Sequence, residues 1–130
     1  MCDKINKIKE LGEKLTNQIE FVDKLIAAID TSKEGLAILD KDGNYVFLNT
    51  AHQEMFKYSD GEMLGKSWTI LYTEKQIEYF VKNVFPVVSE IGSWKGKDVA
   101  ICKDGTLVKE MIYLTALPDG GLVCTCIIDE

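Results

Sequence analysis

The sequence predicts an α+β domain with a five-stranded antiparallel sheet, preceded by an N-terminal amphipathic helix. Two short apolar runs, 36–39 and 45–48, flank an Asp-Gly turn. Three further apolar runs near the C-terminus follow one another across tight turns, and the segment between the two groups has helical periodicity. Because strands joined by tight turns pair antiparallel, these runs indicate one antiparallel sheet with helices between its two halves.

Residues 4–29 carry a seam of apolar side chains that repeats about every 3.5 residues. The seam consists of Ile5, Ile8, Leu15, Ile19, Val22, Ile26 and Ile29, and Gly12 interrupts it. Such a narrow seam buries poorly against a globular core but well against a second copy of itself, which predicts a parallel coiled-coil dimer. The alternative is a single amphipathic helix folded over the sheet of its own domain, and the sequence leaves both open.

The first two strands form a hairpin that leads directly into a short helix. The Asp-Gly pair at 42–43 tolerates the positive φ of a tight turn. Asn49 follows the second strand and can accept hydrogen bonds from the first N–H groups of a helix. Apolar side chains then recur at helical spacing from Ala51 to Tyr58.

A second, longer helix is expected from Thr73 to Ile91. Thr73 and Gln76 form the reciprocal capping pattern at its start, and one face is apolar to its end. Pro86 lies inside this helix, where it removes a hydrogen bond and clashes with the preceding turn. We therefore expect the helix to break near Phe85 and to restart with Pro86 in its first turn, where a missing N–H does no harm.

The last three strands are predicted at 97–103, 107–117 and 122–128. The middle one has two apolar faces: Leu107, Met111, Tyr113 and Leu117 on one, and Val108, Ile112, Leu114 and Ala116 on the other. A sheet that is apolar on both faces must be covered on both. We expect the helices of the domain on one face, and the N-terminal helix or a partner on the other.

Composition excludes several classes of protein. The chain of 130 residues is long enough for one domain, and no apolar run approaches the length of a membrane span, so a cytoplasmic location is expected. Its net charge is −6, and all 15 basic residues are lysine. Nucleic-acid binding through a basic face is therefore not expected.

The cysteines and the single histidine do not indicate a metal or catalytic site. Cys2, Cys102, Cys124 and Cys126 lack metal-binding spacing and are expected to be reduced, buried thiols. His52 has no recognisable catalytic partner and is expected on the surface of its helix or half-buried.

Several short motifs occur in an order that resembles PAS (Per-Arnt-Sim) sensory domains. They are Gly35, Asp40, Gly43, Asn49, Met55-Phe56-Lys57-Tyr58, Leu64-Gly65-Lys66, Gly92 to Gly96, Lys103-Asp104-Gly105 and Asp119-Gly120-Gly121. The resemblance covers residues 23–130, which leaves 1–22 as an N-terminal signalling or dimerisation helix. Lys57 stands where the family most often has glycine, so a different backbone is expected there.

The resemblance implies a PAS fold, with helices on one face of the sheet and a cavity between the sheet and the long helix. The candidate lining residues are Phe56, Trp68, Leu71, Ile77, Phe80, Ile101, Met111, Tyr113 and Cys126. The alternative is that they simply fill the core. The long helix lacks the histidine that binds haem in related oxygen sensors, and the cysteine motif of flavin-binding light sensors is missing. Neither haem nor flavin is therefore expected, whereas an unknown small ligand is possible.

The function implied by the resemblance is sensory and non-catalytic. A PAS domain of this kind would sense a small molecule or a redox cue, or mediate dimerisation, within a sensor histidine kinase or related receptor. It would form a homodimer and act on an output domain, a kinase or a cyclase, beyond Glu130. The alternative is a ligand-free dimerisation module.

Overall fold

The computed structural model describes residues 2–129, so the predicted outer ends of the two domains, at Met1 and Glu130, lie outside the described residues. The chain divides into two compact units, the first ending at Thr31 and the second beginning at Ser32. The boundary predicted between residues 22 and 23 lies inside the helix of the first unit. Within the described residues, no helix is both long and apolar enough to cross a membrane.

The first unit is one uninterrupted helix, α1 (Cys2–Asp30), in which no side chain is buried. Gly12 does not break it, and the Thr16 hydroxyl donates to the Gly12 carbonyl at 2.9 Å. The exposed apolar residues include the predicted seam except Ile29, which is half-buried, and also Leu11 and Leu25, which lie next to the seam on the helix. The apolar stripe is therefore wider than the seam alone.

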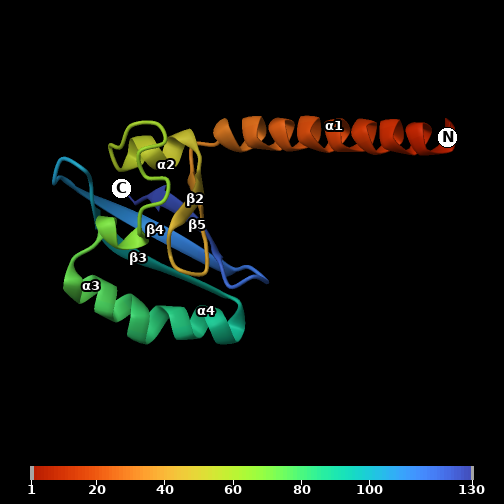
Figure 1. The fold of residues 1–130 in the computed structure, drawn as a ribbon. Helices are drawn as coiled ribbons and strands as arrows, with labels where there is room; N and C mark the ends of the chain where they lie inside the picture. The colour runs from red at the N-terminus through yellow and green to blue at the C-terminus, as the bar shows by residue number, and fades with distance from the viewer. Residues whose placement is uncertain (1, 130) are drawn as a thin grey trace. The chain divides into compact units, whose positions relative to one another are not determined.

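The second unit contains the predicted five-stranded antiparallel sheet, with strand order β2-β1-β5-β4-β3. Its strands are β1 (Gly35–Leu39), β2 (Tyr45–Leu48), β3 (Ser93–Ile101), β4 (Leu107–Ala116) and β5 (Leu122–Ile128). Figure 1 shows the strands side by side, with α3 (Glu74–Tyr79) and α4 (Phe85–Ile91) running together along one side of them. The predicted fold class is confirmed.

The first hairpin and its following helix form as predicted. Gly43 has φ 82°, and a Cβ there would lie 2.9 Å from Cδ1 of Trp68, so both the turn and the packing require glycine. Asn49 caps α2 (Thr50–Met55): its Oδ1 accepts from the His52 N–H at 3.0 Å and from the Leu36 N–H at 2.9 Å. One amide side chain therefore fixes the start of the helix to the first strand.

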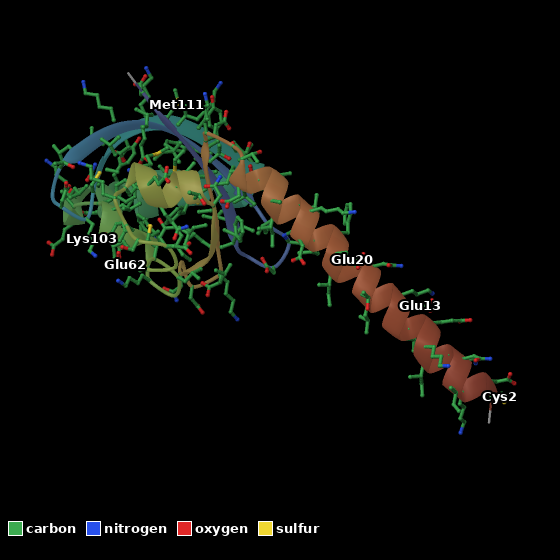
Figure 2. The ribbon with its side chains drawn as sticks, turned by 90° about the horizontal axis from the view of Figure 1, so that it is seen from above. Cys2, Glu13, Glu20, Glu62, Lys103 and Met111 are labelled. Carbon is green, nitrogen blue, oxygen red and sulfur yellow. The ribbon has the colours of Figure 1, made fainter. Side chains whose placement is uncertain are left out.

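The segment after α2 is tied to the turn between β3 and β4. Lys57 adopts φ 65°, the left-handed conformation that glycine favours, so the different backbone expected there is not found. Its Nζ lies 3.1 Å from Asp104 and 2.8 Å from the Thr106 hydroxyl, contacts that offset a conformational cost of about 1 kcal/mol. Lys103 pairs with Glu62 beside it, as Figure 2 shows.

The long helix begins as predicted but contains an irregular turn in place of the predicted break. Thr73 and Gln76 form the full capping box. After α3, a π-helical turn, η2 (Phe80–Val84), leads into α4, and the Phe85 N–H donates to the Phe80 carbonyl. Pro86 occupies the first turn of α4, as predicted. The backbone stays helical throughout, because a π turn absorbs the proline without breaking the helix.

Replacing Pro86 with alanine is expected to change the free energy of unfolding by less than about 1 kcal/mol. A helix-interior proline would cost about 3 kcal/mol, but a first-turn proline lacks only an N–H that has no helical partner. Urea denaturation of the variant tests this. Stabilisation by about 3 kcal/mol would mean that the π turn is a strained response to the proline.

The third strand begins at Ser93 rather than at Lys97. Gly92, with φ 99°, ends α4 in the left-handed conformation, and the chain pairs with β4 at once. The sequence from 93 to 97 offered few apolar residues, so its strand character was missed. Trp94 packs against the core, but the residues on either side of it are exposed.

Candidate functional site

A small cavity lies in the core of the second unit, between the sheet and the helical segments. Its volume is about 30 Å³, which is room for about two water molecules. It is lined by Leu39, Tyr45, His52, Trp68, Leu71, Tyr72, Phe80, Phe85, Ile112, Leu114, Leu122, Cys124 and Cys126. The wall is mainly aromatic and aliphatic, with a few polar atoms set into it, which is the usual make-up of a small-molecule site.

Four of the nine candidate residues line this cavity: Trp68, Leu71, Phe80 and Cys126. Phe56 is fully buried in the same core but lies behind His52, its ring centroid 4.8 Å from that of the histidine. Ile77 is half-buried on α3 and does not line the cavity.

The remaining three candidates, Ile101, Met111 and Tyr113, lie on the outer face of the sheet. The buried residues of β4 are Glu110, Ile112 and Leu114, so alternation turns Met111 and Tyr113 outward. Ile101 pairs with Leu107 and faces outward too. Figure 2 shows Met111 on one side of the strands and Glu62 and Lys103 on the other. Both faces of β4 are apolar in sequence, so the pattern could not show which one faces the helices.

Aromatic rings separate the cavity from an open groove at the end of the sheet. Trp68 and Phe85 line both spaces, with ring centroids 5.1 Å apart, and are called the ring gate below. The groove has a volume of about 500 Å³. It runs between the turns at 40–43 and 117–121 and the α4 residues Val88 and Ser89. A molecule that passes the ring gate would move directly from solvent into the core.

Glu110 is a fully buried carboxyl group on the inner face of β4. The Tyr72 hydroxyl donates to its Oε1 at 2.5 Å, whereas its Oε2 has no hydrogen-bond partner among the described residues. Burial raises the pKa of Glu110 from 4.5 to about 7, despite the opposing effects of hydrogen bonding by Tyr72 and by the Cys126 thiol. Asp98, directly across on β3, raises this pKa further.

His52 is buried to 1% exposure, so the surface or half-buried position expected for it is wrong. Its helix packs closely on β1, where a Cβ on Gly35 would lie 3.0 Å from the His52 Cα. The imidazole lies edge-on to Tyr45 and Phe56, and its Nδ1 has no partner among the described residues. Burial lowers the pKa of His52 to about 4, so the ring is neutral at physiological pH.

Three of the four cysteines are buried thiols, as expected, whereas Cys2 is exposed. Burial raises the pKa of Cys124 to about 12 and that of Cys126 well above its ordinary value. Both therefore stay protonated and are poor nucleophiles. Among residues 2–129, no three His, Cys, Asp or Glu side chains gather in a group that could hold a metal ion.

Sequence reasoning missed Glu110, although a signal for it exists. The apolar positions 108, 112 and 114 share one face of the middle strand, and period-two alternation puts residue 110 on that face as well. A charged residue in an otherwise apolar, inward row predicts a buried carboxyl.

A known protein family and several solved structures are similar to this chain. A family model described as "PAS domain" matches residues 33–129. The PAS domain of a protein from Colwellia psychrerythraea has a TM-score of 0.76 and 17% identity, over 84% of this chain and 97% of that one. A PAS domain from a two-component sensor histidine kinase has a TM-score of 0.73 and 16% identity, over 87% and 99%.

A third similar structure is the PAS domain, in complex with ethanol, of a LuxR-family transcriptional regulator from Burkholderia thailandensis. Its TM-score is 0.72 and its identity 19%, over 78% of this chain and 94% of that one. At these identities the likeness shows a shared fold. Comparison with curated proteins gives no match.

Proposed function

The chain belongs to the PAS domain family, and from this premise we propose that it is the sensory part of a signal-transduction protein and binds a small molecule in its core cavity. The observation that carries this function is the core cavity itself, which shares Trp68 and Phe85 with the lining of the open groove. A ligand in the cavity would contact the sheet on one side and the π turn on the other. It could therefore bias the packing of the long helix on the sheet.

The chemistry of the cavity supports a small ligand. Its volume of about 30 Å³ is far below the several hundred cubic ångströms of typical drug-sized sites. The similar domain of the LuxR-family regulator is described in complex with ethanol, which is a molecule of suitable size. PAS domains are in general non-catalytic sensory modules, and Tyr72 and His52 contribute polar atoms to the cavity wall that a ligand would contact.

The signalling context is also part of this proposal. One similar structure comes from a sensor histidine kinase and another from a transcriptional regulator. A cytoplasmic location and control of an output domain, such as a kinase or a cyclase, fit both. Ligand binding would then reach the output domain as a change in helix packing.

The purified protein is expected to be colourless and to release a small molecule when it is denatured. The cavity is too small for haem or flavin, and the segment from Glu74 to Ile91 contains no histidine ligand. Native mass spectrometry before and after denaturation, with a visible absorption spectrum, tests both points. A visible band that survives desalting would overturn the expected absence of a chromophore. A mass equal to that of the bare chain, unchanged by added small molecules, would overturn ligand sensing.

A second candidate function is dimerisation through α1. The specific observation that favours it is the exposed apolar seam along the whole helix. Ligand sensing and dimerisation are compatible, because a coiled coil with two packings can report a change in an attached sensory domain.

A further inference from the structure

Two carboxyl groups lie beside each other on the inner face of the sheet. Glu110 on β4 and Asp98 on β3 are direct partners in the antiparallel ladder, which places their Cβ atoms about 4.5–5.5 Å apart. Glu110 is fully buried and Asp98 is half-buried. The next residue but one along β3 is the buried Ala100, so alternation turns Asp98 inward too. Like charges directly opposite each other on two strands are destabilising.

In the described part of the chain, no lysine compensates the charge of this pair. The ion pairs of residues 2–129 include neither Glu110 nor Asp98, and they are made by Lys57, Lys82, Lys97 and Lys103. The Oε2 atom of Glu110 also has no hydrogen-bond partner among these residues. A buried carboxylate without a counter-charge is strongly destabilising, whereas a neutral carboxyl group costs far less to bury. The pair therefore accommodates one negative charge far better than two.

Burial and hydrogen bonds place the proton of this pair on Glu110. The Oδ1 atom of Asp98 accepts from the Gln76 side-chain amide and from the Val99 N–H, each at 2.7 Å. Glu110 is more deeply buried, and its Oε1 accepts from the Tyr72 hydroxyl at 2.5 Å. Because donors favour the charged form of a carboxyl group and burial disfavours it, Asp98 carries the negative charge and Glu110 carries the proton.

Both carboxyl groups hold the short segment that leads into α3, residues 72–76. Tyr72 lies just before this helix and Gln76 lies in its first turn, and they donate to the two carboxyl groups of the pair. Gln76 also completes the capping box with Thr73. Because these contacts fasten the start of the helix to the sheet, the charge of Glu110 acts directly on the position of the 72–76 segment.

We propose that the pair of Glu110 and Asp98 is a proton sensor, in which a proton on Glu110 keeps the 72–76 segment on the sheet and loss of this proton favours a lifted segment. In the lifted state, water reaches the Glu110 carboxylate and removes the cost of burying its charge. The segment begins the long helix, so its position changes how that helix packs on the sheet. The signal is then the pH itself, which goes beyond the small-molecule function proposed above and does not require a ligand in the core cavity.

The titratable groups that face Glu110 come from four other elements. They are Tyr72 from the end of the η1 turn (Trp68–Leu71), Asp98 from β3, Cys124 and Cys126 from β5, and Tyr45 from β2. Burial raises the pKa of both tyrosines and both thiols, so these four groups stay protonated. His52, which contacts Tyr45 from α2, has its pKa lowered by burial to about 4 and is neutral. Burial raises the pKa of Glu110 to about 7, so Glu110 changes its charge in the physiological range.

The direction of the response follows from proton binding. The pKa of Glu110 is about 7 while the segment lies on the sheet, and it returns to its ordinary value of 4.5 once water reaches the carboxyl group. The state with the segment on the sheet therefore binds more protons between these two values. The population of the lifted state should rise roughly tenfold for each pH unit up to about 7 and level off above it.

Hydrogen exchange measured by NMR on the full chain tests the lifting. The reporter is the Gln76 side-chain amide, which donates to Asp98 and to the Val99 carbonyl, each at 2.7 Å, and must leave both when the segment lifts. After correction for the intrinsic exchange rate, its exchange should be roughly twentyfold faster at about pH 7.5 than at about pH 5.5.

The same spectra contain a matched reporter away from the pair. The side-chain amide of the buried Gln53 donates to Asp60 and to the Asn49 carbonyl in the region of α2. Its exchange should change by no more than about threefold, because in global unfolding the effect of His52 offsets most of that of Glu110.

Two carboxyl variants identify the group that responds to pH. Glu110→Gln resembles the protonated acid and has no charge to lose, so the exchange of the Gln76 amide should no longer depend on pH. The exposed control Glu90→Gln should keep the dependence of the wild type. A Glu110 side chain with a merely structural role would leave the Gln76 amide independent of pH in the wild type as well.

Two further variants should shift the response in opposite directions. The Tyr72 hydroxyl lowers the pKa of Glu110 and the charge of Asp98 raises it. The titration midpoint of Glu110, measured by carbon NMR of its side-chain carboxyl, should therefore move upward in Tyr72→Phe and downward in Asp98→Asn. Asparagine can still accept from Gln76, so the second variant keeps the hydrogen bond that holds the segment.

Three results would overturn the proton sensor. The first is exchange of the Gln76 amide that rises no more with pH than that of Gln53. The second is a titration midpoint of Glu110 near its ordinary value of 4.5. The third is an unchanged pH dependence in Glu110→Gln. None of these results would affect the small-molecule function, because the pH response does not require a ligand in the cavity.

Discussion

A Glu110→Gln variant is expected to be about 3 kcal/mol more stable than the wild type at about pH 8, and equal to it within about 1 kcal/mol at about pH 5. The carboxyl group is fully buried, and its pKa rises from 4.5 in the unfolded chain to about 7 in the folded protein. Glutamine has nearly the same shape as the protonated acid and can still accept from the Tyr72 hydroxyl. The variant therefore removes the pH-dependent cost of the charge.

The sign of this effect follows from proton binding. Because the pKa of Glu110 is higher in the folded state, its contribution to stability is complete below about pH 4.5 and is lost as the pH rises through about 7. Urea denaturation of both proteins at the two pH values measures the change. The difference between pH values cancels any constant cost of the new amide. If the difference in the free energy of unfolding between the variant and the wild type is the same at both pH values, water reaches Glu110 in the folded state.

His52 changes the stability of the protein with pH in the opposite direction to Glu110. Its pKa is lowered from 6.5 to about 4, so its contribution is complete above about pH 6.5 and is lost as the pH falls through about 4. Between about pH 4.5 and 6.5, the changes in the free energy of unfolding that arise from Glu110 and His52 nearly cancel in the wild type. Without Glu110, the stability of the variant should fall by about 2 kcal/mol across this interval on acidification.

The parts of the fold that follow from neighbouring residues could be predicted from the sequence. The Asn49 cap, the capping box at Thr73 and the turn at Gly43 are each fixed by a few adjacent residues, and the structure has all three. Pro86 was correctly placed in a first turn. The π turn before it was not foreseen, because it depends on how the buried Phe80 and Val84 pack on the sheet.

The candidate site could be predicted only in part, because a face of a strand is chosen by tertiary packing. Trp68 and Phe80 were identified as pocket residues, whereas Met111 and Tyr113 were placed on the wrong side of the sheet. Tyr113 is 41% exposed, but tyrosine also occurs in protein cores, so the residue type does not show which face of the sheet it lies on. The deep burial of His52 depends on the close approach of its helix to Gly35, which no local pattern records.

Lysine at both Ile19 and Val22 is expected to convert a dimeric protein into monomers. The two residues lie three apart on the same seam of α1, and both are exposed in the single chain. In a parallel pair of helices they would face their counterparts, so the double variant would place four charges in a desolvated seam. A cost of at least about 4 kcal/mol would raise the dissociation constant by roughly a thousandfold.

The matched control adds the same charge outside the seam. Asn6→Lys with Asn17→Lys also introduces two lysines into α1, at positions on its polar side, and should leave the dimer intact. Sedimentation equilibrium at micromolar concentrations compares the three proteins.

A wild type that is already monomeric would favour α1 folded over its own sheet, and its wider apolar stripe, with Leu11 and Leu25, suits that packing. A seam variant that stays dimeric would place the interface on the outer face of the sheet, where Tyr113 and Leu107 are exposed. Loss of the dimer in the control as well would show that charge on the helix, and not the seam, sets the association.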